Sequence, residues 1–135
     1  MQLVVNSNVL FAALIKDSIT RKLFLHINAK LFVLQANYQE MEKYKQELLV
    51  KSKMNEVTFN LLLEQLTKRC IFVDKEAILK HWDEAKDVIF EIDAGDVPFV
   101  AAALATGSDI WSDDEHFEKQ KKIKVWKTAD LAKLI

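Results

Sequence analysis

Short apolar runs recur along the chain and predict buried strands. They lie at residues 3–5, 31–34, 71–73, 110–111 and 125–126. The first, Leu3-Val4-Val5, is apolar at successive positions, which is typical of a strand covered on both faces of a parallel sheet. The sequence therefore predicts about five strands.

The segments between these runs have the periodicity of helices. Ile78, Trp82, Ala85 and Ile89 follow one another at helical spacing. Two further stripes are Met41, Tyr44, Leu48 and Leu49, and Val57, Leu61, Leu62 and Leu66. Residues 99–105 are apolar nearly all round and predict a buried helix. A short final helix is expected from Thr128 as its N-cap, with Leu131 and Leu134 facing inward.

Strands that alternate with helices predict an α/β fold in three layers, α/β/α, with a central parallel sheet of about five strands. No linker or repeat interrupts residues 1–135, so we expect a single domain. In open parallel sheets, ligands bind outside the carboxyl ends of the strands, where the strand order reverses. Polar residues just after the predicted strands are therefore the candidates for a site.

Composition limits the possible functions. The chain has 135 residues, a net charge of −1 and only two glycines, so neither a phosphate-binding P-loop nor a dinucleotide-binding turn can be built. The single cysteine and three dispersed histidines give no zinc-binding spacing. No run is long enough to span a bilayer and no signal-peptide pattern is present. The simplest expectation is a cytoplasmic protein without membrane contact.

Four groups of polar residues lie where a site is expected. Asn6-Ser7-Asn8 follows the first strand, Asp93 and Asp96 precede the alanine-rich helix, Ser112-Asp113-Asp114 follows the fourth strand, and Glu40 lies at the start of the helix containing Met41. Each group has a structural alternative. Asn6 and Asp96 are suited to cap helices, Ser and Asp are common in turns, and Glu40 would complement a helix dipole or pair with Lys43.

Several carboxylates at one sheet edge are the oxygen ligands that Mg²⁺ and similar hard cations prefer. Clustered acids repel one another, so they need a cation or raised pKa values. A basic strip also stands out, formed by Lys119, Lys121, Lys122, Lys124 and Lys127. The structural alternative is that these lysines only face solvent. They would contribute to function only if they lie beside such a site.

These segments resemble a PIN domain in sequence and order over essentially the whole chain. The family opens with a hydrophobic strand, an Asp-Thr/Ser/Ala-Asn motif and Val/Ile-Leu, which stands here as VVNSNVL. The helix EMEKYKQEL places Glu40 at the second acid. The segment DAGDVPFVAAALATGSDIW places Asp96 at the third, and WSDDEHF supplies Ser112 and Asp114 at the fourth.

The resemblance implies a metal-dependent endoribonuclease that cleaves RNA phosphodiester bonds with Mg²⁺ or Mn²⁺. Glu40, Asp96 and Asp114 would be catalytic, and with Asn6 they would hold the metal. Asn8 and Ser112 would orient these metal ligands through hydrogen bonds, and Asp93 and His116 would assist them. The strip residues Lys119, Lys121, Lys122 and Lys124 would contact RNA. The family includes toxins of toxin–antitoxin pairs, so an antitoxin protein and a homodimer are expected partners.

Asn6 departs from the family, because an amide stands where the first aspartate is expected. An amide oxygen can coordinate a cation but brings no charge, so metal affinity should fall. Three explanations of this amide are open. The protein has lost activity and kept the fold, or it works weakly with Glu40, Asp96 and Asp114 alone. Alternatively, the sequence is an inactivated variant of a nuclease that harms its host. The alternative function is a catalytically inactive PIN-like module that binds RNA or protein.

Overall fold

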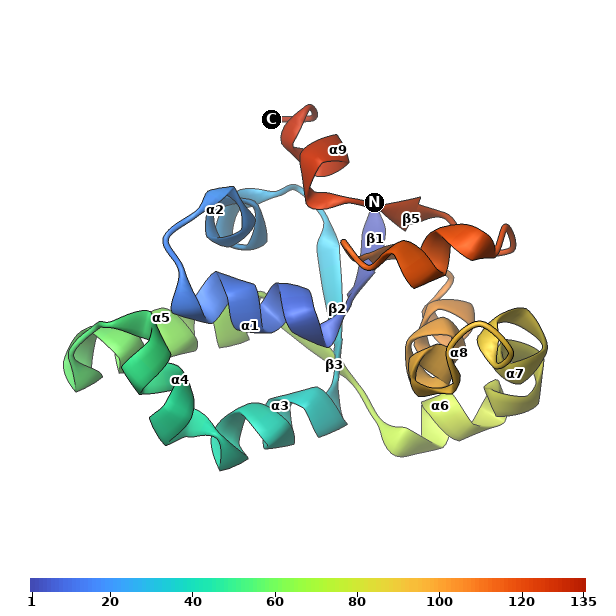
Figure 1. Ribbon diagram of the computed structural model, residues 1–135, viewed down its shortest axis with the longest axis horizontal. Helices are drawn as coiled ribbons and strands as arrows, with labels where there is room; N and C mark the ends of the chain where they lie inside the picture. The colour runs from blue at the N-terminus through green and yellow to red at the C-terminus, as the bar shows by residue number, and fades with distance from the viewer.

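A single sheet of five parallel strands forms the centre of the computed structural model, which describes residues 1–135 (Figure 1). The strands are β1 (Gln2–Val5), β2 (Lys30–Leu34), β3 (Cys70–Val73), β4 (Asp109–Trp111) and β5 (Val125–Trp126). Their order across the sheet is β3-β2-β1-β4-β5, and every neighbouring pair is parallel. The predicted strands and the parallel sheet are confirmed.

Helices cover both faces of this sheet, as the three-layer prediction requires. The helices are α1 (Ser7–Ile15), α2 (Ile19–His26), α3 (Gln35–Lys43), α4 (Lys45–Ser52), α5 (Glu56–Arg69), α6 (Lys75–Lys80), α7 (Trp82–Ile89), α8 (Val97–Thr106) and α9 (Thr128–Ala132), with short 3-10 helices η1 (Ala94–Asp96) and η2 (Glu115–Lys119). In Figure 1, α1, α2, α4 and α5 lie on one side of the sheet and α6, α7 and α8 on the other. No helix is long and apolar enough to cross a membrane.

Alternate residues of the central strand pack on opposite faces, which produces two separate cores. Leu3 and Val5 belong to the core under α1, α2 and α5, whereas Val4 belongs to the core under α8. Both cores exclude solvent at these positions, with Leu3 and Val4 fully buried. The continuous apolar run in β1 is thus explained by burial on both sides.

Some predicted helix faces are wrong. In α5, Val57 and Leu61 are 71% and 57% exposed, whereas Leu66 of the same predicted stripe is buried, together with Phe59 and Leu63. The buried face is therefore rotated from the predicted one and shares only Leu66 with it, and in a segment this rich in leucine the periodicity alone does not choose between the two faces.

Breaks and ends of helices also differ from the expectation. The stripe through Tyr44 is split between α3 and α4, and Tyr44 itself is 43% exposed. The stripe from Ile78 to Ile89 is divided at His81. In α9 the N-cap is Lys127 rather than Thr128, because the Asp130 carboxylate accepts a hydrogen bond from the Lys127 N–H. Leu134 lies beyond this helix and is 55% exposed.

The topology creates one reversal of strand order. The chain passes from β1 to β2 and β3 on one side and returns to β4 and β5 on the other side. The carboxyl ends of β1 and β4 are therefore neighbours at the switch point, the usual place for a ligand in an open parallel sheet.

Candidate metal centre

Asn6 leaves β1 at this switch point and begins α1. Its N–H donates to the Trp111 carbonyl at the end of β4 (3.0 Å), which ties the two strand ends together. Its side-chain Oδ1 accepts a hydrogen bond from the Asn8 N–H (3.0 Å). This hydrogen bond makes the buried Asn6 side chain the N-terminal cap of α1, as the structural alternative predicted.

A tight turn before α8 positions two of the aspartates. The Asp93 Oδ1 accepts a hydrogen bond from the Gly95 N–H (2.9 Å), and the Asp93 carbonyl accepts one from the Asp96 N–H (3.1 Å). Asp96 thus stands directly before Val97 and Pro98, which open α8. Proline is tolerated in a first helical turn because the N–H that it lacks would have no partner there.

The Asp96 side chain does not cap the helix. It forms no capping hydrogen bond, the residue is only 7% exposed, and its Oδ2 is buried without any hydrogen-bond partner. A buried carboxylate oxygen with no partner is costly, because it has lost water without gaining a donor. Asp96 thus holds the expected N-cap position of α8 but makes no capping hydrogen bond, and its buried Oδ2 is left without a partner.

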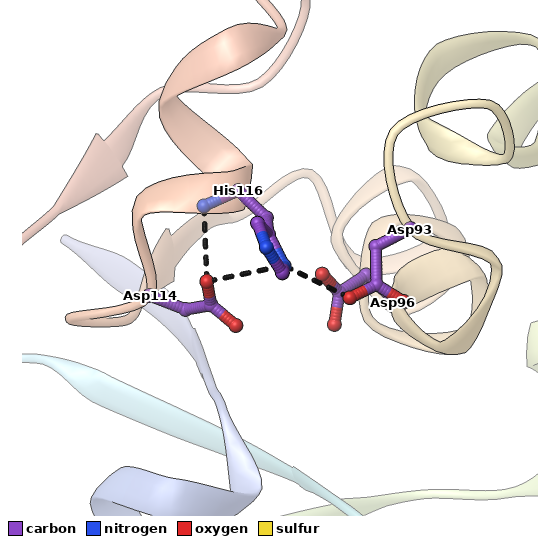
Figure 2. Close-up of side chains that lie close together, drawn as sticks. All are labelled: Asp93, Asp96, Asp114 and His116. Atoms are coloured by element: carbon purple, nitrogen blue, oxygen red, sulfur yellow. Dashed lines mark hydrogen bonds and ion pairs between the residues drawn. The ribbon is translucent and has the colours of Figure 1, made fainter.

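The loop after β4 brings the remaining groups to the same place. The buried Ser112 Oγ accepts from the Asp114 N–H (3.0 Å), and the Asp114 Oδ1 accepts from the His116 N–H (2.9 Å). These two local bonds fix the start of η2 so that Asp114 and His116 face the beginning of α8 (Figure 2).

Three carboxylates and one imidazole form the resulting cluster. Asp93, Asp96, Asp114 and His116 each offer one ligand atom, and these atoms lie within 4.8 Å of one another. The His116 Nδ1 lies between two of the carboxylates, 2.9 Å from the Asp93 Oδ2 and 3.4 Å from the Asp114 Oδ1 (Figure 2). We call these four residues the acidic cluster.

The electrostatics of the acidic cluster are unfavourable for ionised acids. Burial, and after it the negative charges of Asp93 and Asp114, raise the pKa of Asp96 to about 6, while His116 opposes this shift. A divalent cation would remove this penalty by supplying positive charge and a partner for the free Asp96 oxygen. Oxygen ligands with one imidazole suit Mg²⁺ or Mn²⁺, so the donor set fits such an ion.

The structure does not bring Glu40 into the acidic cluster. Glu40 is exposed, and it is the sixth residue of α3, which begins at Gln35 directly after β2. The expectation that Glu40 starts its helix is therefore wrong, because α3 begins five residues earlier. Asn6 is at the correct end of the sheet, but its Oδ1 already accepts the Asn8 N–H.

The remaining candidate residues lie outside the acidic cluster. Asn8 shares a cavity of about 230 Å³ with Asp113 and Asp114. Asp113 has a structural task, since its two oxygens accept hydrogen bonds from the Thr128 N–H (2.8 Å) and Oγ1 (2.7 Å) and so hold α9. Lys119 ends η2, one turn after His116, and the other three lysines predicted to contact RNA follow it, all of them exposed.

Sequence reasoning gave Asp93 and His116 only assisting roles, whereas the structure places both inside the acidic cluster. The available signal was spacing, because Asp93 precedes Asp96 by three residues and His116 follows Asp114 by two. Such spacings become informative only when the turn at Gly95 and the start of η2 are known.

The fold and this site together define a class of α/β domains with a candidate acidic metal centre at the switch point of the sheet. The chain belongs to the PIN domain family, whose model matches residues 4–133 and thus nearly the whole chain. PIN domains are generally metal-dependent nucleases. A comparison with curated proteins returned no match.

Proposed function

We propose that this PIN domain is a metal-dependent endoribonuclease that hydrolyses RNA phosphodiester bonds with Mg²⁺ or Mn²⁺ at the acidic cluster. The observation that carries the proposal is the buried, partnerless Oδ2 of Asp96 among two further carboxylates. Without a cation this arrangement is an electrostatic cost, whereas with one it becomes a binding site.

The residues divide into ligands and supports. Asp96 and Asp114 would hold the cation, and Asp93 and His116 would assist them from within the acidic cluster. Glu40 would contribute only if α3 moves toward the cluster. When bound, the cation supplies charge neutralisation for the phosphate and activates water for attack. Ser112 fixes the backbone of Asp114, and the Asp93 carboxylate orients the His116 ring through Nδ1.

RNA as the substrate is supported by the lysines that follow the acidic cluster. Lys119, Lys121, Lys122 and Lys124 are exposed and form no salt bridge, whereas Lys127 pairs with Glu118 at 2.9 Å. Ammonium groups that form no salt bridge can neutralise backbone phosphates. Lys124 also lies 4.1 Å from the centre of the Trp126 ring, which holds its side chain in place.

Asn6 favours a second candidate function, a PIN module that binds RNA or protein without cleaving it. Its side chain is committed to capping α1 and it supplies no charge. Glu40 also lies outside the acidic cluster, so only part of the family's acid set is assembled.

Metal titration followed by a cleavage assay tests the proposal. Calorimetry with Mn²⁺ and cleavage of single-stranded RNA would compare the natural chain with Asn6→Asp, Asp96→Asn and the exposed control Asp83→Asn. We expect Asn6→Asp to raise Mn²⁺ affinity about tenfold or more, because it adds a negative charge beside the ion. Asp96→Asn should abolish binding, and Asp83→Asn should change neither readout.

The outcomes separate the two functions. Cleavage by the natural chain, or cleavage gained on Asn6→Asp, supports the nuclease. Absence of metal binding and cleavage even in Asn6→Asp would overturn it in favour of the binding module.

We further propose that the chain acts as a toxin restrained by an antitoxin and forms a homodimer, as the family resemblance implies. Co-purification of a small partner that suppresses cleavage, together with a dimer mass in light scattering, would support this. A monomer whose activity no partner changes would contradict it.

A further inference from the structure

An open groove lies between α3 and the helices α6 to α8. It has a volume of about 460 Å³ and is bordered by the ends of β2 and β3. Apolar side chains make most of its lining, including Trp82, Leu79 and Pro98, and its polar lining consists of Gln35, Gln39 and Lys75. We call this the α3–α8 groove. Its volume is within the range of small-molecule sites.

We propose that the α3–α8 groove binds an unpaired base of single-stranded RNA that flanks the phosphate to be cleaved. This inference rests on the proposed ribonuclease function and extends it, because it assigns a substrate form and a subsite to residues outside the acidic cluster.

Trp82 supplies the surface on which a base can stack. It starts α7 and is partly buried against the core beneath α8, so the indole is held while part of it stays accessible. Aromatic side chains bind bases of any sequence through their π-faces, with the aliphatic side chains of Ile78 and Leu79 completing the apolar walls.

The polar lining matches a nucleotide in charge and hydrogen bonding. Gln35 and Gln39 lie one turn apart on α3 and are exposed, and their amides can both donate to and accept from a base edge. Lys75 is exposed and forms no salt bridge, so its ammonium is free for a phosphate.

No carboxylate lines the groove, although the chain has 20 acidic residues. The two acids next to Lys75 in sequence, Asp74 and Glu76, line a separate cavity instead. Lys75 is therefore the one charged side chain in the lining of the groove. This charge favours a nucleotide over an apolar peptide, which would leave Lys75 and both glutamines without partners.

The start of α8 links the groove to the candidate metal centre. Pro98 lines the groove and lies two residues after Asp96, in the first turn of this helix. Nucleotides of one strand could therefore reach both the acidic cluster and the groove.

Binding measured without metal tests the inference independently of cleavage. A single-stranded RNA hexamer would be titrated in EDTA against the natural chain, Trp82→Leu, Trp82→Phe and the control Phe90→Leu, with circular dichroism to verify folding. Phe90 is a matched aromatic, since it is 50% exposed and lies outside the groove. We expect Trp82→Leu to raise Kd about five- to a hundredfold, Trp82→Phe to retain most affinity, and Phe90→Leu to match the natural chain.

Abasic RNA identifies the bound base. Hexamers with a single abasic position would be compared for the natural chain and Trp82→Leu. One position should weaken binding to the natural chain by the same factor as Trp82→Leu, with no further loss when both changes are combined. Equal losses at that position in both proteins, unchanged affinity in Trp82→Leu, or absence of RNA binding would overturn the inference. So would Trp82 fluorescence quenching by an apolar octapeptide but not by RNA.

The subsite and the nuclease can fail separately. Mn²⁺-dependent cleavage with the same kcat/KM in Trp82→Leu would contradict the groove and leave the nuclease intact. Trp82-dependent RNA binding in a chain that neither binds Mn²⁺ nor cleaves would support the groove and overturn the nuclease.

Discussion

Asp96 is a buried acid whose ionised form is unfavourable in the folded protein. It is buried at the start of α8, its Oδ2 has no partner, and two neighbouring carboxylates add negative charge. An acid whose pKa is higher in the folded than in the unfolded protein destabilises the fold wherever it is ionised. This residue therefore couples stability to pH and to metal.

The metal-free protein should be less stable above pH 6 than its Asp96→Asn variant. The unfolded chain ionises near the ordinary value of 3.8 and the folded chain near 6, so the penalty is absent below pH 3.8, grows between these values and is complete above 6. We expect Asp96→Asn to gain about 2–3 kcal/mol in urea unfolding at pH 7.5 in EDTA, and little at pH 3.5. Saturating Mn²⁺ should stabilise the natural chain and not the variant.

The exposed Asp83→Asn is the control and should show no such pH dependence. An equal gain for Asp96→Asn at both pH values would show that the free oxygen and its charge are not the cause.

The sequence was sufficient to indicate Asp96, Asp114 and Ser112, because each stands at the end of a strand or the start of a helix in a recognisable motif. It could not show that the Asp96 Oδ2 lacks a partner, since that depends on how α8 packs on the sheet. The hydrogen bond from the Asn8 N–H to the Asn6 side chain, by contrast, follows from the expected cap of α1.

At the scale of elements, the two arginines of the chain stabilise helix ends. The Arg21 guanidinium donates to the carbonyls of Ala13 (2.8 Å) and Leu14 (3.1 Å) in the last turn of α1. Arg69, at the end of α5, donates to Phe24 (3.0 Å), Ile27 and Ala29 (3.4 Å) around the end of α2. Carbonyls at a helix C-terminus have no partner within the helix, so these side chains supply one.

Removing the Arg69 fork should destabilise the fold. Arg69→Leu leaves several partly buried carbonyls unpaired, and we expect a loss of about 2–4 kcal/mol in urea unfolding. Arg69→Lys should recover less than half of the loss, because an ammonium cannot reproduce the planar fork. The adjacent Lys68 pairs only with the exposed Glu64, so Lys68→Ala is a matched control that should cost less than about 1 kcal/mol. Equal losses for Arg69→Leu and Lys68→Ala would contradict this role.

Strands were predicted more accurately than helices for a physical reason. Each strand is a short continuous apolar run, and all five were located in this way, although only the inner strands are buried on both faces and the edge strand β3 leaves Ile71 and Phe72 exposed. Helix breaks at Tyr44 and His81 leave the apolar spacing almost intact, so the periodicity of the stripe does not detect them. Rotation of α5 is likewise decided by packing against α2, not by its own sequence.

The whole molecule has little excess charge but distributes it unevenly. With a net charge of −1 and both arginines occupied by backbone carbonyls, only lysines are available for phosphate contacts. Four of these lie in residues 119–124, from the end of η2 to the residue before β5, and Lys75 lies in the α3–α8 groove. We therefore expect the phosphates of RNA to contact two separate sets of lysines, one in residues 119–124 and one at Lys75.

This charge distribution predicts the salt dependence of RNA binding. Each phosphate neutralised by a lysine releases counterions, so log Kobs should fall with log[salt] at a slope of about −0.7 per contact for a single strand. Replacing Lys119, Lys121, Lys122 and Lys124 together by glutamine should reduce the magnitude of the slope by up to about 3 and weaken binding to all sequences alike. Fluorescence anisotropy with a labelled single-stranded RNA in EDTA, over 50 to roughly 300 mM KCl, measures the slope without cleavage.

The matched control replaces four exposed lysines elsewhere in the chain by glutamine and so removes the same charge. These lysines are Lys16, Lys22, Lys51 and Lys53. If both quadruple variants reduce the slope equally, net charge alone governs binding and the segment after η2 is not the contact surface.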